Sequence, residues 1–261
     1  MGDVQLTTQQ KLDFYENGFL IIPGAVSPFL VNAALHTINY SLGEEGMNKN
    51  DLPTLRAQSY CQEMRNAPAV TDLANKSAMI PVMESLVGKD NLIAVESGQI
   101  ALRFPHLPGA ELNPPSGHLD GLGSGLNGSA KGTYRRSFTG LAVILLSPLS
   151  DIYSGNFTVW PKSHTFFENF FRENGVQVLE NGMPKVDLPE PPLQITGNAG
   201  DLVVVHHQVV HTAAPNHSPN IRYAAIFRLH HQQTSSLGNQ AYTDIWREWP
   251  GIQETISATG Q

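Results

Sequence analysis

From residue 92 onward the chain is a succession of short apolar runs separated by turn residues, and this pattern limits the fold more than any other feature. Each run is apolar or alternates apolar with polar residues, and Gly, Pro, Asn or Ser bounds it, as in β-strands joined by turns. The expected strands are residues 92–95, 99–104, 140–146, 157–160, 202–205 and 223–229. We therefore expect a mainly β (α+β) fold with a double-stranded β-helix core, of the jelly-roll or cupin-like kind, with about eight antiparallel strands.

Helix signals dominate the part of the chain before these runs. Thr7 with Gln10 forms a capping-box pair that predicts a helix over residues 8–17. Ser27 followed by Pro28 predicts the start of a second helix, because proline is favoured at the first helical position. These helices are expected to support the β core.

Three further segments complete the expected layout. A third helical region covers residues 70–87 and is expected to break near Pro81. Residues 44–66 are polar and irregular and are interpreted as a loop or a lid, and residues 176–192 form a loop-rich excursion. Residues 166–173 are expected to form a short aromatic-rich helix.

The length of 261 residues suits one domain. Within it we expect helical support over about 1–90, a β core over about 91–232 and a C-terminal extension over 233–261. With the single cysteine Cys61 the chain can form neither an internal disulfide nor a Cys-based zinc site. The polar start and the lack of a long apolar run predict a soluble cytoplasmic protein with no membrane partner.

The net charge of −7 argues against nucleic acid as a partner, because such surfaces need clustered lysine and arginine. A single anionic ligand can still be held by one buried arginine. We therefore expect a small-molecule substrate, and the oligomeric state is left open.

A His-x-Asp triplet, His118 and Asp120, is the first candidate for chemistry. On an extended strand these two residues point to the same face and can reach one ion together. A third ligand, His211, follows an apolar, β-branched run far downstream. Two histidines and one carboxylate leave open positions on iron(II), which oxygen chemistry needs.

Arg222 strengthens this interpretation, since it lies eleven residues after His211, on the next apolar run. An arginine entering a β core needs an anionic partner because its charge cannot be neutralised there. Its planar guanidinium suits a carboxylate.

Four segments, in this order, resemble the phytanoyl-CoA dioxygenase-like branch of iron(II)/2-oxoglutarate oxygenases. They are DFYENGFLIIPG at residues 13–24, GHLD at 117–120, GNFTVWPKSH at 155–164, and the stretch from Gly200-Asp201 through His206 and His211 to Asn216 and Arg222. The resemblance covers nearly the whole chain. It implies an iron(II)- and 2-oxoglutarate-dependent dioxygenase that uses O2 to hydroxylate an aliphatic carbon of a metabolite, acyl or natural-product substrate and releases succinate and CO2.

The resemblance also assigns roles to residues. It makes His118, Asp120 and His211 the catalytic metal ligands and Arg222 the partner of the distal carboxylate of 2-oxoglutarate. The metal-bound carboxylate favours hydroxylation or desaturation over halogenation, because the related halogenases have a small residue in its place.

Further cosubstrate or substrate contacts are expected from Gln99 and Arg103, on the strand before the His-x-Asp element. The chain departs from the family pattern at Lys162, where glycine is usual. It departs again at Ala213, where a hydroxyl residue often holds the cosubstrate, and Thr212 is the expected substitute.

Two other classes of function stay open. One is a non-catalytic ligand-binding or regulatory member of the same fold, which Ala213 allows. The other is a cupin-type metal enzyme that uses no 2-oxoglutarate. Residues 123–128 match Gly-x-Gly-x-x-Gly, but no strand precedes and no helix follows them, so we interpret them as a mobile loop beside the metal rather than a dinucleotide site. This loop and residues 44–66 and 176–192 are expected to shape the pocket mouth.

Overall fold

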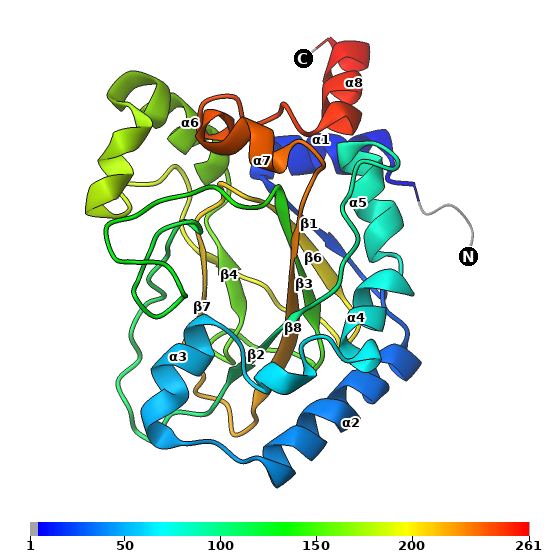
Figure 1. The fold of residues 1–261 in the computed structure, drawn as a ribbon, viewed down its shortest axis with the longest axis vertical. Helices are drawn as coiled ribbons and strands as arrows, with labels where there is room; N and C mark the ends of the chain where they lie inside the picture. Colours follow the sequence, from blue (N-terminus) through cyan, green and yellow to red (C-terminus); the bar gives the residue numbers. More distant parts are fainter. Residues whose placement is uncertain (1–4, 261) are drawn as a thin grey trace.

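The fold is built on two antiparallel β-sheets that lie face to face, with helices around them (Figure 1). The structure is a computed structural model and describes residues 5–260. The ends of the expected domain, residues 1–4 and residue 261, therefore lie outside the described residues. The strands are β1 Phe19–Ile22, β2 Gln99–Arg103, β3 Gly140–Leu145, β4 Phe157–Val159, β5 Leu193–Gln194, β6 Leu202–His206, β7 His211–Ala213 and β8 Arg222–Leu229.

The larger sheet has the strand order β1-β6-β3-β8-β2 and the smaller sheet the order β5-β4-β7. Alternation of side chains along each central strand divides the core between two layers. In β3, Leu141 and Val143 face the smaller sheet and pack with Phe157 and Val159. The other face of the same strand packs under the helices. The expected double-stranded β-helix with supporting helices is thus confirmed.

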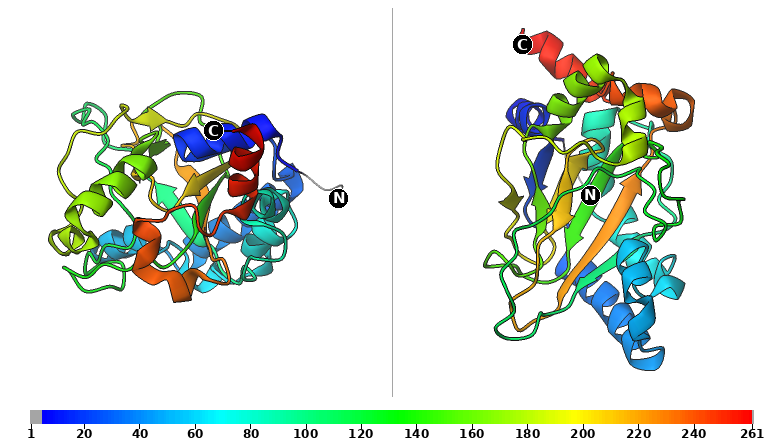
Figure 2. Two further views of the ribbon diagram at one scale, coloured as in Figure 1. Left: turned by 90° about the horizontal axis from the view of Figure 1, so that it is seen from above. Right: turned by 90° about the vertical axis from the view of Figure 1, so that its left-hand side faces the viewer.

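Helices surround the two sheets and lie at both ends of the strands (Figure 1). They are α1 Thr8–Asn17, α2 Pro28–Glu44, α3 Leu52–Ala57, α4 Pro68–Asn75, α5 Met79–Val87, α6 Ser163–Asn174, α7 Thr234–Leu237 and α8 Pro250–Thr259. Short 3-10 segments lie at Lys49–Asp51, Gln62–Met64, Val176–Asn181 and Gly238–Tyr242. Helices α4 and α5 lie on one side of the strands and α6 on the other (Figures 1 and 2). No described helix is long and apolar enough to cross a membrane.

Several local predictions are confirmed by this arrangement. Helix α1 begins with both hydrogen bonds of the Thr7–Gln10 capping box. It ends at Gly18, whose φ of 78° suits glycine. The side chain of Ser27 caps α2, and Pro28 is its first residue. Strands β2, β3, β4, β6 and β8 lie where they were expected.

The structure corrects or refines three expectations about local structure. Residues 92–95 form no strand, because Leu92 makes only an isolated bridge to His231, beyond the end of β8. The third helical region breaks near Pro81 as expected, but the break lies between Asn75 and Met79 and not at the proline itself. Pro81 falls in the first turn of α5, where its missing N–H costs nothing. The segment 44–66, expected to be a loop or a lid, contains α3 and two 3-10 turns and is therefore not a plain loop.

Two buried histidines link the β core to its neighbours as neutral rings. His206 Nε2 donates to the carbonyl of Ile245 (3.0 Å) while its Nδ1 accepts from the amide of Gln208 (3.1 Å). His164 Nε2 donates to the carbonyl of Tyr15 (3.0 Å). Burial lowers the pKa of His164 to about 4 and the pKa of His206 well below its ordinary value.

The metal-free protein should therefore lose stability as the pH falls from about 6.5 toward about 4. In this window the unfolded chain binds protons at histidine while the folded chain keeps these rings neutral. Calorimetric Tm values across this range should show the decline, and His164→Gln should make it shallower. The exposed position His36→Gln is the control; an equal effect of both variants would contradict the assignment.

Candidate metal and cosubstrate site

The two histidines of the candidate site face each other across one antiparallel bridge. The amide of His118 donates to the carbonyl of His211 (3.0 Å), and the amide of His211 donates to the carbonyl of His118 (3.1 Å). His211 is the first residue of β7, so the bridge fastens the loop after β2 to the smaller sheet. The full strand expected around His118 does not form, and this bridge alone brings the two rings to a centroid distance of 4.6 Å.

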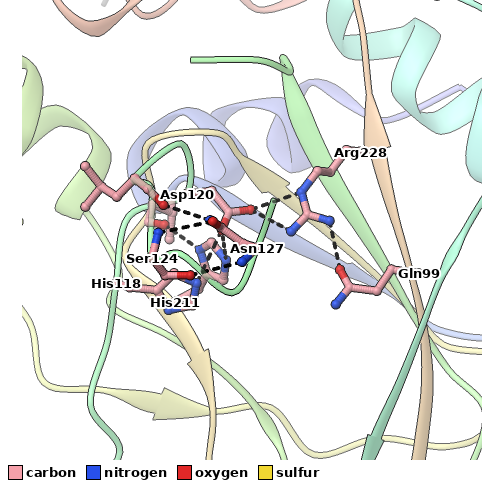
Figure 3. Close-up of polar contacts among 9 residues, drawn as sticks. Gln99, His118, Asp120, Ser124, Asn127, His211 and Arg228 are labelled. Carbon is pink, nitrogen blue, oxygen red and sulfur yellow. Dashed lines mark hydrogen bonds and ion pairs between the residues drawn. The ribbon is translucent and has the colours of Figure 1, made fainter. Parts of the chain in front are cut away.

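Asp120 lies between the two rings (Figure 3). Its Oδ1 is 3.3 Å from His118 Nε2 and 3.8 Å from His211 Nε2. One ligand atom from each of the three residues lies within 4.8 Å of the others, and no other such group of three occurs in residues 5–260. Two imidazole nitrogens and one carboxylate oxygen are the donor set of a facial iron(II) site, so these residues fit the ion.

His211 is prepared to offer a lone pair. Its Nδ1 lies 2.9 Å from the carbonyl of Val209, which can only accept, so Nδ1 carries the proton and Nε2 is free. Burial lowers the pKa of His211 to about 4, against the opposing charge of Asp120. The ring is therefore neutral at pH 7, the form that binds a metal.

Arg228 controls the second oxygen of Asp120. Its Nη2 and Nε lie 3.0 and 3.3 Å from Asp120 Oδ2, and its Nη1 donates to Gln99 Oε1 at 2.8 Å (Figure 3). Burial would raise the pKa of Asp120, but Arg228, followed by His118 and His211, holds it well below its ordinary value. Oδ1 is left facing the two imidazoles.

Arg228 was not predicted from the sequence as a site residue. The alternation of side chains along a strand could have predicted its position, because residues 222, 224, 226 and 228 share one face. That face is the inner one, since Ala224 packs between the sheets. An arginine at residue 228 therefore points toward the same cavity as Arg222.

Arg222 is buried at the start of β8 and has no carboxylate partner among residues 5–260. Its Nε donates to the carbonyl of Gly155 (2.7 Å) and its Nη1 to the carbonyl of Ala101 (3.0 Å). Burial, and then Arg103, lower the pKa of Arg222 to about 9, so it stays charged at pH 7. Such a charge fits a carboxylate ligand.

Gly155 makes this placement of Arg222 feasible. Its φ is 76°, and an added Cβ would lie 2.8 Å from the Cβ of Arg103 and 3.1 Å from the Cβ of Arg222. Arg103 lies directly opposite Arg222 in the β2–β8 register. The glycine thus lets a turn pack onto two neighbouring arginines.

A cavity of about 520 Å³ joins the histidines, Asp120 and these arginines. Its apolar wall includes Leu141, Phe157 and Ile226. The expected contact residues Gln99, Arg103, Thr212 and Arg222 all line it, as does Ala213. Gln99 is already engaged by Arg228.

The expected mouth segments differ in their placement. Helix α3 and the glycine-rich loop both line the cavity, through Arg56 and Asn127 among others. The side chain of Asn127 shapes that loop by accepting from the amide of Ser124 (3.1 Å) and donating to the carbonyl of Leu122 (2.8 Å). No residue of the segment 176–192 lines this cavity.

One protein family matches most of the chain. The profile of the phytanoyl-CoA dioxygenase family matches residues 14–224. No curated protein sequence matches the chain.

The chain is similar in structure to three solved proteins. The non-heme alpha-ketoglutarate-dependent carbocyclase SnoK from nogalamycin biosynthesis has a TM-score of 0.60 at 19% identity, covering 88% of this chain and 85% of its own. EctD from S. alaskensis, solved with 2-oxoglutarate and 5-hydroxyectoine, has a TM-score of 0.56 at 14% sequence identity. The match covers 90% of this chain and 79% of EctD. HygX from Streptomyces hygroscopicus, with nickel and 2-oxoglutarate bound, has a TM-score of 0.55 at 18% sequence identity. The match covers 87% of this chain and 88% of HygX.

Replacing Arg228 should weaken metal binding, although Arg228 contacts Asp120 Oδ2 and not the Oδ1 atom that faces the two histidines. In Arg228→Leu, Asp120 loses the partner that fixes its Oδ2, and we expect about a tenfold rise in the Kd for manganese(II), measured by calorimetry. Arg247→Gln, at an exposed arginine paired with Asp244, should bind manganese(II) like the wild type. Unchanged affinity in Arg228→Leu would contradict a positioning role.

Proposed function

Since the chain belongs to the phytanoyl-CoA dioxygenase family, we propose that His118, Asp120 and His211 hold its iron(II) and that Arg222 binds the distal carboxylate of 2-oxoglutarate. The enzyme is a non-haem iron(II)/2-oxoglutarate-dependent oxygenase, as expected from the resemblance. The residue assignments are our proposal. They are supported by the convergence of the three ligand atoms and by the cavity that joins them to Arg222.

The observation that carries the cosubstrate assignment is the buried, uncompensated charge of Arg222. Its described hydrogen bonds go to backbone carbonyls, and the charged group that most affects its pKa is another arginine, Arg103. Burying a guanidinium without an anion is costly. A dicarboxylate whose far end meets Arg222 removes this cost. A metal enzyme that uses no cosubstrate has no need of this arrangement.

Bound iron(II), with 2-oxoglutarate and O2, supplies the oxidation of an aliphatic C–H bond and releases succinate and carbon dioxide. The chain contributes position and charge. Arg228 keeps Asp120 ionised and presents one of its oxygens to the metal. The carbonyl of Val209 orients the ring of His211. The apolar wall at Leu141, Phe157 and Ile226 limits water beside the reacting carbon.

The remaining expected contacts are part of the same proposal. Thr212 lies beside His211 on β7 and lines the cavity, where its hydroxyl can meet the cosubstrate in place of the hydroxyl absent at Ala213. Arg103 lies opposite Arg222 and adds positive charge at the same end. Gln99 acts through Arg228, because its Oε1 accepts a hydrogen bond from Arg228 Nη1. The substrate is proposed to be a small molecule, hydroxylated at an aliphatic carbon.

The variant Arg222→Gln separates cosubstrate binding from metal binding. Loss of charge-assisted hydrogen bonds should raise the Kd for 2-oxoglutarate at least about tenfold in calorimetry with manganese(II)-loaded protein. The Kd for manganese(II) itself should stay at the wild-type value.

Arg247→Gln serves as the control and should bind both ligands normally. Equal 2-oxoglutarate affinity in Arg222→Gln and wild type would contradict the proposed contact. Succinate formation from 2-oxoglutarate by the iron-loaded wild type, lost in Arg222→Gln, tests the same point in turnover.

A further inference from the structure

The nine arginines of this chain divide into two groups by whether they line the cavities beside the candidate site. Three lie outside the cavities beside the candidate site, and each pairs with a carboxylate: Arg136 with Glu248, Arg172 with Glu168 and Arg247 with Asp244. The other six line these cavities: Arg56, Arg65, Arg103, Arg135, Arg222 and Arg228. Of the six, only Arg228 has a carboxylate within ion-pair distance among residues 5–260.

A second cavity, of about 460 Å³, adjoins the first. The two share Ala57, Asp120, Asn127 and Arg228 in their walls. Arg228 packs over the ring of Phe138 on the side of the second cavity (5.7 Å). The Asp120–Arg228 pair is therefore a common wall between them.

Arg65 and Arg135 line the second cavity and not the first, whereas Arg103 and Arg222 line the first and not the second. Within residues 5–260, Asp120 is the only carboxylate in the wall of the second cavity, and Arg228 already pairs with it. The Nε of Arg65 is buried and has no hydrogen-bond partner among the residues that the structure describes. Ser129, Thr133 and Ser137 line the same cavity.

The charges of the two cavities do not balance without an anion. Iron(II) and 2-oxoglutarate carry opposite charges of equal size, and Arg228 compensates Asp120. The cosubstrate is proposed to lie at the Arg103 and Arg222 end of the first cavity, but its two negative charges already match those of iron(II), so these arginines add to the positive excess. Arg65 and Arg135 remain, in a protein whose net charge is −7. Positive charge held in a cavity of an acidic protein selects negatively charged ligands.

We propose that the second cavity is a subsite for an anionic group of the substrate, held by Arg65 and Arg135. The substrate class is a small organic anion, a carboxylate or a phosphate ester. Its charged group lies between these two arginines, and its oxidised carbon lies across the Asp120–Arg228 wall, beside the metal ligands. Arg56, exposed at the edge of the first cavity, adds positive charge along the path. This inference rests on the proposed function, which places the cosubstrate at the Arg222 end.

Calorimetry with inorganic sulfate as the probe tests the subsite. The full-length protein is first saturated with manganese(II) and 2-oxoglutarate, so that the Arg222 end is filled before sulfate is added. Wild type should bind sulfate, and Arg135→Gln and the double variant Arg65→Gln/Arg135→Gln should bind it at least about tenfold more weakly. Arg247→Gln is the matched control, since Arg247 is exposed and lies outside both cavities, and should bind sulfate like the wild type.

Methyl phosphate and acetate, titrated in the same way, distinguish a phosphate ester from a carboxylate as the group that is held. Arg135 is exposed, so Arg135→Gln keeps the test valid if the double variant does not fold. Absence of sulfate binding to the loaded wild type, or equal binding in Arg135→Gln, would overturn the subsite. The loading steps report separately on the proposed function, because a wild type that binds neither manganese(II) nor 2-oxoglutarate contradicts that proposal instead.

Discussion

The candidate site depends on the ion pair between Asp120 and Arg228, which places a negative charge beside the two histidines. The Oδ1 of Asp120 faces two imidazoles, and its Oδ2 is held by Arg228. Burial alone would raise the pKa of Asp120, and Arg228, followed by the two histidines, holds it well below its ordinary value. The negative charge that a cation needs is thereby kept in a largely apolar cavity. Removing either partner leaves the other charge uncompensated.

The fold supplies this arrangement from segments far apart in the chain. The reciprocal hydrogen bonds of His118 and His211 bring the His-x-Asp element to the smaller sheet. Strand β8 of the larger sheet contributes both arginines from its inner face, Arg222 at its start and Arg228 near its end. The space between the sheets is therefore charged at two points along β8, and the metal ligands lie beside the Arg228 end.

The sequence predicted the parts of this site that depend on local pattern. His118 and Asp120 are neighbours in a short motif, and Arg222 opens a clear apolar strand. Arg228 was missed because its role depends on which face of β8 points inward, and this is set by packing between the two sheets. Residues 92–95 were misassigned because their apolar pattern suits a strand, while they make only an isolated bridge to His231, beyond the end of β8. The uneven pairing of the arginines also appears only when the chain is folded.

The most direct test of this account is an anaerobic absorption titration with iron(II) and 2-oxoglutarate. Iron(II) on His118, Asp120 and His211, with 2-oxoglutarate bound beside it, should give a weak visible charge-transfer band that is absent with either component alone. The band should disappear in Asp120→Ala. A wild type that shows no band and binds no divalent metal, or an Asp120→Ala variant that keeps the band, would contradict the central claim.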